Sequence, residues 1–252
     1  MTVRAAIIGA ILDWPESHTG CHLGALVTQI NRQLNAPVSQ NAVLEAIEDL
    51  RRRELIESDA AIYRVREPDC RELDLYELLE PAFLLAQFKA SLGIRSDRLV
   101  FQKTATGGPL GSGLLSKPDF TLAVIQLWRF DPEKSLEVYS FEVKNRAGAG
   151  LNSVYETVAH GRFVHHPYLV CPRSRFDQSL NAGMQAACER EGVGLILFDL
   201  IADDGVHTIS RLEMAVRPER RPIDPWIVQQ FLEGRLTPEN QDQLANHAKG
   251  AT

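Results

Sequence analysis

The segment Leu136-Glu-Val-Tyr-Ser-Phe-Glu-Val-Lys144 has the alternating pattern of a β-strand, and a lysine stands at its end. Successive side chains of a strand point to opposite faces, so Phe141 faces one side while Glu142 and Lys144 project together from the other. The chain holds six lysines against 21 arginines, and Lys144 alone among the six has a carboxylate two residues before it. This pairing of charges on one face makes the strand the most informative part of the sequence.

A second apolar run, residues 120–128, precedes this strand, and Asp119 stands directly before it. A polar turn sequence with an Asp131-Pro132 step separates the two runs. If the runs pair antiparallel about that step, Asp119 lies opposite position 144 or 146, beside the charged residues of the neighbouring strand. The sequence therefore predicts two carboxylates and an ammonium group at one end of a hairpin.

Such a cluster has a plausible chemistry. Two carboxylates at one point repel each other and lose hydration, so they favour a cation between them. Oxygen ligands suit a hard divalent ion, Mg²⁺ or Mn²⁺, which can polarise a phosphodiester oxygen and activate a bound water. A nearby lysine can orient that water and offset the charge that builds up on the phosphorane. The alternative is that Glu142 and Lys144 form an ordinary ion pair on a solvated strand, which contributes little.

The motif is Pro118-Asp119, then 22 residues, then Glu142-Val-Lys144. It resembles the signature of the PD-(D/E)XK nuclease superfamily, which has a restriction-endonuclease-like α/β core: helix, three-stranded antiparallel meander, helix, strand. The expected elements follow this order over residues 72–200. Besides the strand at 136–144, they are helices at Asp74–Leu92, Asn152–Val164 and about Phe176–Glu191, and strands at Arg98–Thr104, Phe120–Trp128, Tyr168–Cys171 and Gly194–Phe198, with an edge strand at Ser210–Val216.

The resemblance implies a metal-dependent nuclease that hydrolyses phosphodiester bonds, with DNA as the expected substrate and Mg²⁺ (or Mn²⁺) as the cofactor. Carried over by position, Asp119 and Glu142, together with Val143 between Glu142 and Lys144, match the metal site. Lys144 matches the catalytic lysine. On this basis the enzyme would be a Mg-dependent endodeoxyribonuclease.

Two further family positions are less well matched. Family members often add a carboxylate from the first helix, for which Glu80 and Glu77 are the candidates. Many members also place a glutamine on the helix after the lysine strand, where this chain has His160 as a candidate catalytic residue. Glu156 lies one turn earlier on the same helix face. Ordinary polar helix residues are an equally good interpretation of His160 and Glu156.

Residues 1–67 are predicted to form a separate small domain. Helices are expected at Thr2–Trp14, His22–Leu34 and Ser39–Arg53, with Ser39 as an N-cap, followed by two short extended runs. Three helices and a hairpin resemble a winged helix-turn-helix domain. A nuclease-like domain at 72–216 and a C-terminal helical tail at 217–252 complete the expected organisation.

A winged helix that reads DNA would present Gln40 and Asn41 to base edges and hold Arg64 and Arg66 of the wing near phosphates. However, five acidic residues stand against three arginines between positions 39 and 57, which suits the major groove poorly. Packing or dimerisation is the alternative role of this domain. In the nuclease-like domain, two further arginines are candidates for nucleic-acid contacts: Arg146 and Arg162.

The overall composition sets limits on function. The formal net charge of −6 is mildly unfavourable for a protein that binds polyanions without a metal. Apolar runs are too short to span a bilayer, residues 1–4 begin no signal peptide, and the four cysteines are scattered, so a reduced cytoplasmic protein without a membrane partner is expected. The glycine-rich segment 104–113 is expected as a loop at the mouth of the cleft.

Several alternatives stay open at this point. A non-catalytic nucleic-acid-binding or regulatory protein could have the same two domains, and a subunit of a structural assembly is a weaker third candidate. Either the N-terminal domain or the C-terminal tail could form a homodimer.

Overall fold

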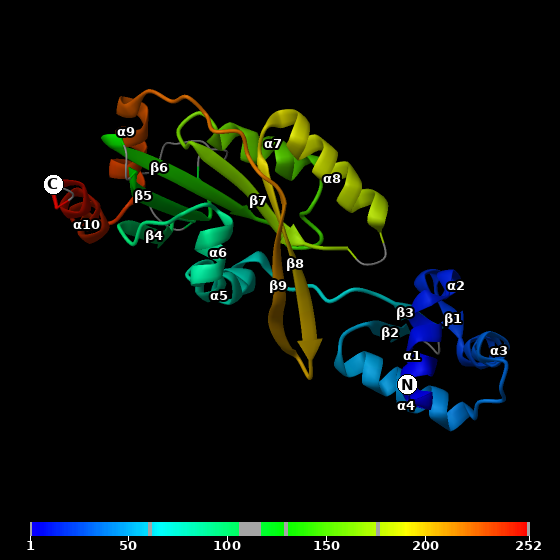
Figure 1. Cartoon of the computed structure of the whole chain (residues 1–252). Coiled ribbons are helices and arrows are strands. Elements are labelled where there is room, and N and C mark those ends of the chain that lie inside the picture. Colours follow the sequence, from blue (N-terminus) through cyan, green and yellow to red (C-terminus); the bar gives the residue numbers. More distant parts are fainter. Residues whose placement is uncertain (1, 60–61, 106–116, 129–130, 175–176, 251–252) are drawn as a thin grey trace. The chain divides into compact units, whose positions relative to one another are not determined.

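A six-stranded mixed sheet forms the centre of the larger of two units in the computed structural model of the chain (Figure 1). The structure describes residues 2–59, 62–105, 117–128, 131–174 and 177–250. One unit comprises residues 1–69 with 200–208, and the other comprises 70–199 with 209–252. Residues 106–113 of the predicted glycine-rich loop lie outside the described residues.

The smaller unit contains the predicted helices and hairpin. Ser39 caps α4 as predicted, because its hydroxyl accepts a hydrogen bond of 3.2 Å from the Ala42 N–H. The helices are α1 (Val3–Asp13), α2 (Pro15–Thr19), α3 (Leu23–Leu34) and α4 (Gln40–Arg52), and the strands are β1 (Cys21–His22), β2 (Ile56–Asp59) and β3 (Ile62–Val65), paired antiparallel in the order β1-β3-β2. The sequence did not predict α2 or β1, which are too short to show a periodicity.

The larger sheet has the order β4-β5-β6-β7-β8-β9. Its strands are β4 (Leu99–Lys103), β5 (Phe120–Trp128), β6 (Asp131–Val143), β7 (His166–Pro172), β8 (Gly194–Asp203) and β9 (Val206–Val216). The first three pair antiparallel as a meander, whereas β6–β7 and β7–β8 pair in parallel. The connections between parallel strands are helical, as crossovers between parallel strands usually are.

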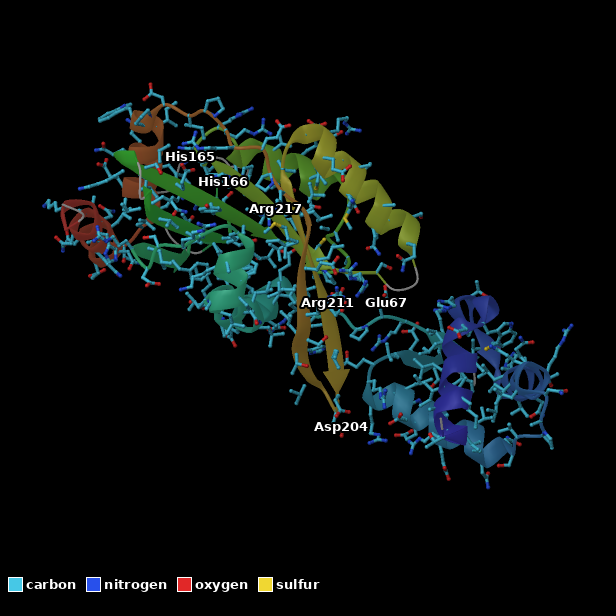
Figure 2. The ribbon with its side chains drawn as sticks, in the orientation of Figure 1. Glu67, His165, His166, Asp204, Arg211 and Arg217 are labelled. Atoms are coloured by element: carbon cyan, nitrogen blue, oxygen red, sulfur yellow. The ribbon has the colours of Figure 1, made fainter. Side chains whose placement is uncertain are left out.

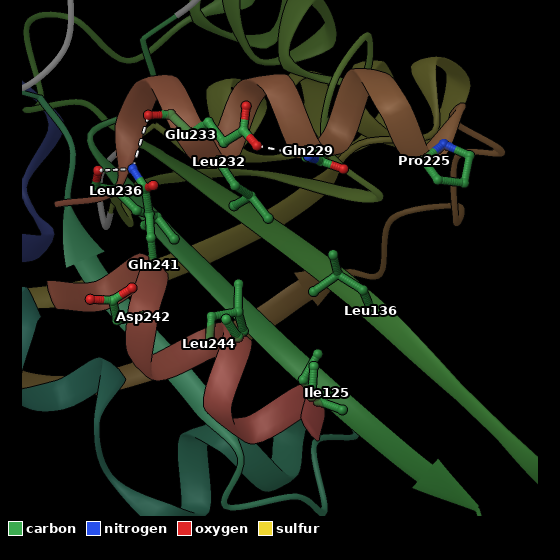
Figure 3. A pocket seen from close by; sticks show the side chains of 12 residues that line it. Ile125, Leu136, Pro225, Gln229, Leu232, Glu233, Leu236, Gln241, Asp242 and Leu244 are labelled. Carbon is green, nitrogen blue, oxygen red and sulfur yellow. Dashed lines mark hydrogen bonds between the residues drawn. The ribbon is translucent and has the colours of Figure 1, made fainter. Parts of the chain in front are cut away.

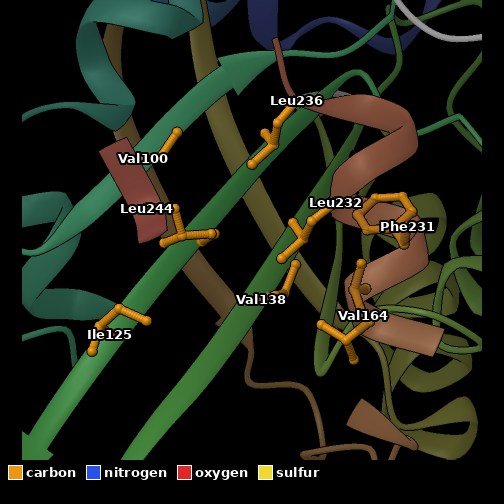
Figure 4. Close-up of a cluster of buried hydrophobic side chains, with 10 residues drawn as sticks. Val100, Ile125, Val138, Val164, Phe231, Leu232, Leu236 and Leu244 are labelled. Atoms are coloured by element: carbon orange, nitrogen blue, oxygen red, sulfur yellow. The ribbon is translucent and has the colours of Figure 1, made fainter. Parts of the chain in front are cut away.

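Helices cover both faces of this sheet. They are α5 (Glu72–Phe83), α6 (Ala86–Ser91), α7 (Leu151–His160), α8 (Gln178–Glu191), α9 (Pro225–Arg235) and α10 (Pro238–Lys249). On one face, Phe83 of α5 stacks on Phe141 at a ring distance of 4.8 Å. On the other face, α7 and α8 pack on β7 and β8, and α9 and α10 pack on the meander (Figure 4).

The predicted helix at 74–92 is interrupted. Leu85 is extended and separates α5 from α6. Phe83 and Phe88 both contact Phe141, at ring distances of 4.8 and 6.1 Å. In one continuous helix, two residues five positions apart would point about 140° away from each other. The interruption therefore lets both rings reach the same side of the sheet.

The predicted register of the hairpin is wrong by at least two residues. Phe120 pairs with Phe141, so Asp119 continues the register opposite Glu142 rather than position 144 or 146. β6 already begins at Asp131, so most of the predicted polar turn is strand, and the turn residues 129–130 lie outside the described residues. The pairing is irregular between Gln126, which pairs with Ser135, and Trp128, which pairs with Asp131. Pro132 lies within this stretch of β6 and has no N–H to donate to the ladder.

The predicted tail docks in part on the larger unit. Phe231 and Leu232 are buried in the cluster shown in Figure 4. Trp226 of α9 is 59% exposed. No helix in the described part of the chain is long and apolar enough to cross a membrane.

Candidate functional site

Asp119 lies just before β5, and hydrogen bonds hold both of its carboxylate oxygens. The Tyr76 hydroxyl donates to Oδ1 at 2.5 Å, and the Val143 N–H donates to Oδ2 at 2.7 Å. Its backbone is fixed as well, because its N–H donates to the Phe141 carbonyl at 3.0 Å. The carboxylate is therefore oriented by α5 on one side and by β6 on the other.

Glu142 and Lys144 meet on the opposite face of β6, toward α7. The Lys144 Nζ lies 2.8 Å from Glu142 Oε1 and 2.8 Å from Glu156 Oε2. The predicted alternation along β6 is confirmed, since Phe141 contacts α5 while Lys144 contacts α7. The ion pair of Glu142 and Lys144 that the alternative expects is present, but it is largely buried rather than solvated, because the two side chains are only 11% and 17% exposed.

The electrostatics of this cluster follow from burial and close charges. Burial raises the pKa of Asp119 to about 6 against the opposing effect of its hydrogen bonds from Tyr76 and Val143. Burial, followed by the charge of Asp119, raises the pKa of Glu142 to about 7. For Lys144, burial lowers the pKa, but hydrogen bonds to Glu142 and Glu156 outweigh it and raise the pKa above its ordinary value. Lys144 therefore remains an ammonium group.

One atom of the cluster lacks a partner. Glu142 Oε2 is buried and accepts no hydrogen bond, and His160 Nε2 lies 3.6 Å from it. A buried carboxylate oxygen without a donor is costly, and a bound cation would remove that cost. This orphaned oxygen, next to the oriented carboxylate of Asp119, fits a divalent cation with oxygen ligands.

His160 occupies the expected position on α7, but within the core. It is 1% exposed, and its Nδ1 lies 3.3 Å from the Ser140 hydroxyl. Burial, and then the charge of Lys144, lowers its pKa to about 3, so the ring is neutral at pH 7. His160 therefore lies in the core close to Glu142, and its ring is shielded from solvent.

Helix α5, the first helix of the predicted nuclease-like domain, approaches the site through Glu72, a residue that the sequence did not suggest. Glu72 begins α5, and its charge raises the pKa of Asp119. Its Oε1 would lie 3.0 Å from a Cβ added at Gly148, next to Lys144. The candidates Glu77 and Glu80 follow later in the helix, and Glu80 is about 12 Å further along its axis.

Sequence patterns indicate neither Glu72 nor Tyr76 as a site residue. Glu72 and Tyr76 are one turn apart on the same helix face. The predicted helix begins at Asp74, which leaves Glu72 outside it, and a lone tyrosine carries no signal for a site. The i,i+4 spacing would have been informative only with the helix start known.

The donor set for a metal is small. Within the described residues, no three or more His, Cys, Asp or Glu side chains are grouped to hold a metal ion. The two carboxylates of Asp119 and Glu142 are the side-chain oxygens that fit. The Val143 N–H is bound to Asp119, and a role of Val143 in binding metal stays a prediction.

The predicted nucleic-acid-binding residues differ in their exposure and in whether another residue of the chain already binds them. Gln40 and Asn41 are exposed in the first turn of α4. Arg64 and Arg66 lie 3.2 and 3.4 Å from Glu57, so both are engaged in ion pairs. The two candidates of the larger unit differ: Arg146 is half-buried and donates to the Arg173 carbonyl at 3.4 Å, whereas Arg162 is exposed after α7.

A second polar cluster, absent from the sequence predictions, holds the segment after β9 against the sheet. His165 and His166 lie side by side where β7 begins (Figure 2). His166 Nε2 is 2.9 Å from Glu137 Oε2, and Arg220 is 3.0 Å from Glu137 Oε1. Glu137 is held by Arg220 and by the His166 ring, which makes this a structural polar cluster distinct from the carboxylate site.

An apolar groove of about 490 Å³ lies between α9, α10 and the β5–β6 pair (Figure 3). Its walls include Ile125, Leu136, Leu232 and Leu244. Ile125 is six residues from Asp119, which along a strand corresponds to about 20 Å. The groove is therefore separate from the carboxylate site.

Comparison with known proteins does not identify a family for this chain. No family model matches the chain, and no curated protein matches its sequence. The solved structure of the restriction endonuclease FokI is similar with a TM-score of 0.23 and 10% sequence identity, over 76% of this chain and 41% of that one. The chain thus spans well under half of that protein, and the similarity is too low to establish a shared fold.

Proposed function

We propose that the chain is a metal-dependent nuclease of the PD-(D/E)XK type that hydrolyses phosphodiester bonds in DNA. One observation carries the proposal: Asp119, Glu142 and Lys144 come together at one end of the β5–β6 pair, and Glu142 Oε2 is left buried without a donor. This arrangement matches the family motif residue by residue in this sequence.

In this proposal the carboxylates of Asp119 and Glu142 hold Mg²⁺ or Mn²⁺. When bound, the ion supplies Lewis-acid polarisation of the phosphodiester and a water of lowered pKa. Asp119 presents an oriented carboxylate because both of its oxygens accept a hydrogen bond. Lys144, held as an ammonium group, offsets the negative charge that develops on the phosphoryl oxygens. Glu72 takes the role of the additional acidic residue from the first helix.

For the smaller unit we propose a winged-helix arrangement, with α4 as the helix that faces DNA. The exposed Gln40 and Asn41 support this role. Against it, Asp49 lies 3.0 Å from both Arg52 and Arg53, so the arginines that end α4 are already neutralised. Contact with another protein is the competing role.

A second candidate function is a nucleic-acid-binding protein that does not cleave. The observation that favours it is the double ion pair of Lys144, which is 2.8 Å from each of two carboxylates. A lysine held in this way could serve as a structural counter-ion.

A cleavage assay separates the two functions. Purified protein is incubated with supercoiled plasmid and labelled oligonucleotides in Mg²⁺, Mn²⁺ or EDTA. We expect cleavage with either metal, none with EDTA, and none from the Asp119→Asn and Glu142→Gln variants. Glu137→Gln is the matched control, because it alters a half-buried glutamate of the same strand outside the site. Intact DNA with the wild-type protein and either metal would contradict the proposal.

A further inference from the structure

Tyr76 joins α5 to the carboxylate site through a single hydroxyl group. The hydroxyl donates to Asp119 Oδ1 at 2.5 Å, across 43 residues of sequence. The other oxygen of Asp119 accepts the Val143 N–H at 2.7 Å. A carboxylate has about four lone-pair positions, so two protein hydrogen bonds leave roughly two for other partners.

The position of that hydroxyl is set by the core. Tyr76 is 6% exposed, and its ring packs edge-to-face on Phe120 with centroids 5.5 Å apart at 85°. Phe120 follows Asp119 directly and is completely buried. The same packing that holds α5 on the sheet therefore places the phenol beside the carboxylate. Burial and the neighbouring carboxylate raise the pKa of Tyr76 far above its ordinary value, so the hydroxyl keeps its proton.

We infer that Tyr76 is a positioning residue that fixes the Asp119 carboxylate for binding a divalent cation. This inference rests on the proposed function of the site. Without the hydroxyl, Oδ1 would lose its donor, and the Val143 N–H would be left to orient the group. Groups that hydrogen-bond a metal-ligating carboxylate typically change metal affinity by about 10- to 100-fold when removed.

Tyr76→Phe tests the inference because it removes the hydroxyl and keeps the ring on Phe120. Tyr168→Phe is the matched control: Tyr168 is 2% exposed on β7, and its ring stacks on Phe141 at 5.5 Å. Calorimetric titration with Mn²⁺ should show affinity weakened by about 10- to 100-fold in Tyr76→Phe and unchanged within about twofold in Tyr168→Phe. In cleavage assays, the half-saturating Mn²⁺ concentration should rise by the same factor, while the rate at saturating Mn²⁺ stays near that of the wild type.

The outcomes separate the inference from the function on which it rests. Wild-type affinity in Tyr76→Phe would overturn the inference and leave the nuclease proposal intact. Absence of Mn²⁺ binding by the wild-type protein would overturn both. If Tyr76→Phe is too unstable for calorimetry, the rise in melting temperature on adding the same concentration of Mn²⁺ gives the same comparison, because a ligand that binds the folded state raises its stability more when it binds more tightly. An equal rise in both variants would again overturn the inference.

Discussion

At the scale of single residues, the position of Lys144 between two carboxylates decides how the site responds to substitution. The ammonium group contacts Glu142 on its own strand and Glu156 on α7, each at 2.8 Å. If a metal engages Glu142, Glu156 still holds the lysine at the site. A structural counter-ion and a catalytic group would both be placed in this way, but they differ in what their loss does to the reaction rate.

Replacing Lys144 by methionine separates these roles. Methionine keeps a long unbranched side chain and removes the charge. Cleavage should fall by about 100-fold or more, because the developing phosphoryl charge loses its partner. Mn²⁺ affinity measured by calorimetry should stay within a few-fold, since the ammonium group is not a ligand. Lys134→Met is the control, because Lys134 lies on the same strand and donates to the Ala248 carbonyl instead. Wild-type cleavage by Lys144→Met would remove the lysine from the mechanism.

The raised pKa of Glu142 makes the metal-free protein sensitive to pH. Its pKa is about 7 in the folded protein, above its ordinary value of 4.5. Between these values the folded state binds more protons than the unfolded state, so this group makes the free energy of unfolding fall as pH rises. Relative to Glu142→Gln, the wild-type protein should lose roughly 3 kcal/mol from pH 4 to pH 8 without metal.

Urea unfolding at a series of pH values measures this difference. Added Mn²⁺ should reduce it, because metal binding favours the ionised carboxylate. A difference between wild type and Glu142→Gln that is independent of pH would show that Glu142 ionises normally in the folded protein.

At the scale of elements, α5 and the loop after β6 form the walls of the site. A Cβ added at Gly148, in that loop, would lie 3.0 Å from Glu72 Oε1, 3.2 Å from Asn145 Oδ1 and 3.5 Å from Lys144 Cδ. These neighbours are side chains rather than backbone, so they can yield. A substitution here should therefore disturb the site more than the fold.

Gly148→Ala tests this expectation. Stability should change by less than about 1 kcal/mol, whereas cleavage should fall several-fold because Glu72 and Lys144 must shift. Gly150→Ala is the control in the same loop, because a Cβ there meets nothing within 4 Å. Equal cleavage by the two variants would argue that the wall near Gly148 does not constrain the site.

Comparing predicted with observed elements shows which parts of the fold sequence patterns can predict. Periodicity predicted the individual strands and helices and placed Glu142 and Lys144 on one face, and the family resemblance implied the meander and the helix after it. They missed the two-residue β1, the interruption at Leu85 and the hairpin register. Each of these depends on tertiary contacts: pairing with β3, the packing of Phe83 and Phe88 on Phe141, and a ladder irregularity near Pro132.

The candidate site shows the same limit. Asp119, Glu142 and Lys144 follow from the motif spacing, since each belongs to one hairpin. Tyr76 and Glu72 come close to Asp119 only because α5 packs on the sheet at that point. Local patterns therefore predict residues that neighbouring strands bring together, but not those that a distant helix supplies.

At the scale of the whole molecule, the question is how a chain of net charge −6 would hold DNA. In the proposed function, a divalent cation at Asp119 and Glu142 would supply positive charge at the carboxylate site. In the smaller unit, both arginines of the predicted wing are paired with the same glutamate, since Arg64 and Arg66 lie 3.2 and 3.4 Å from Glu57. These pairs are exposed, so each is weak enough for a phosphate to replace the carboxylate.

If the wing contacts DNA, Glu57→Gln should strengthen binding, because both arginines become available to phosphates. The double variant Arg64→Ala with Arg66→Ala should weaken binding and reduce the slope of log affinity against log salt by about 2. Fluorescence anisotropy with labelled duplex DNA in EDTA measures binding without cleavage. Arg190→Ala is the control, since Arg190 is exposed on α8 and pairs with Glu191 at 3.0 Å. Unchanged affinity and salt dependence in the wing variants would assign the smaller unit to contacts with protein rather than with DNA.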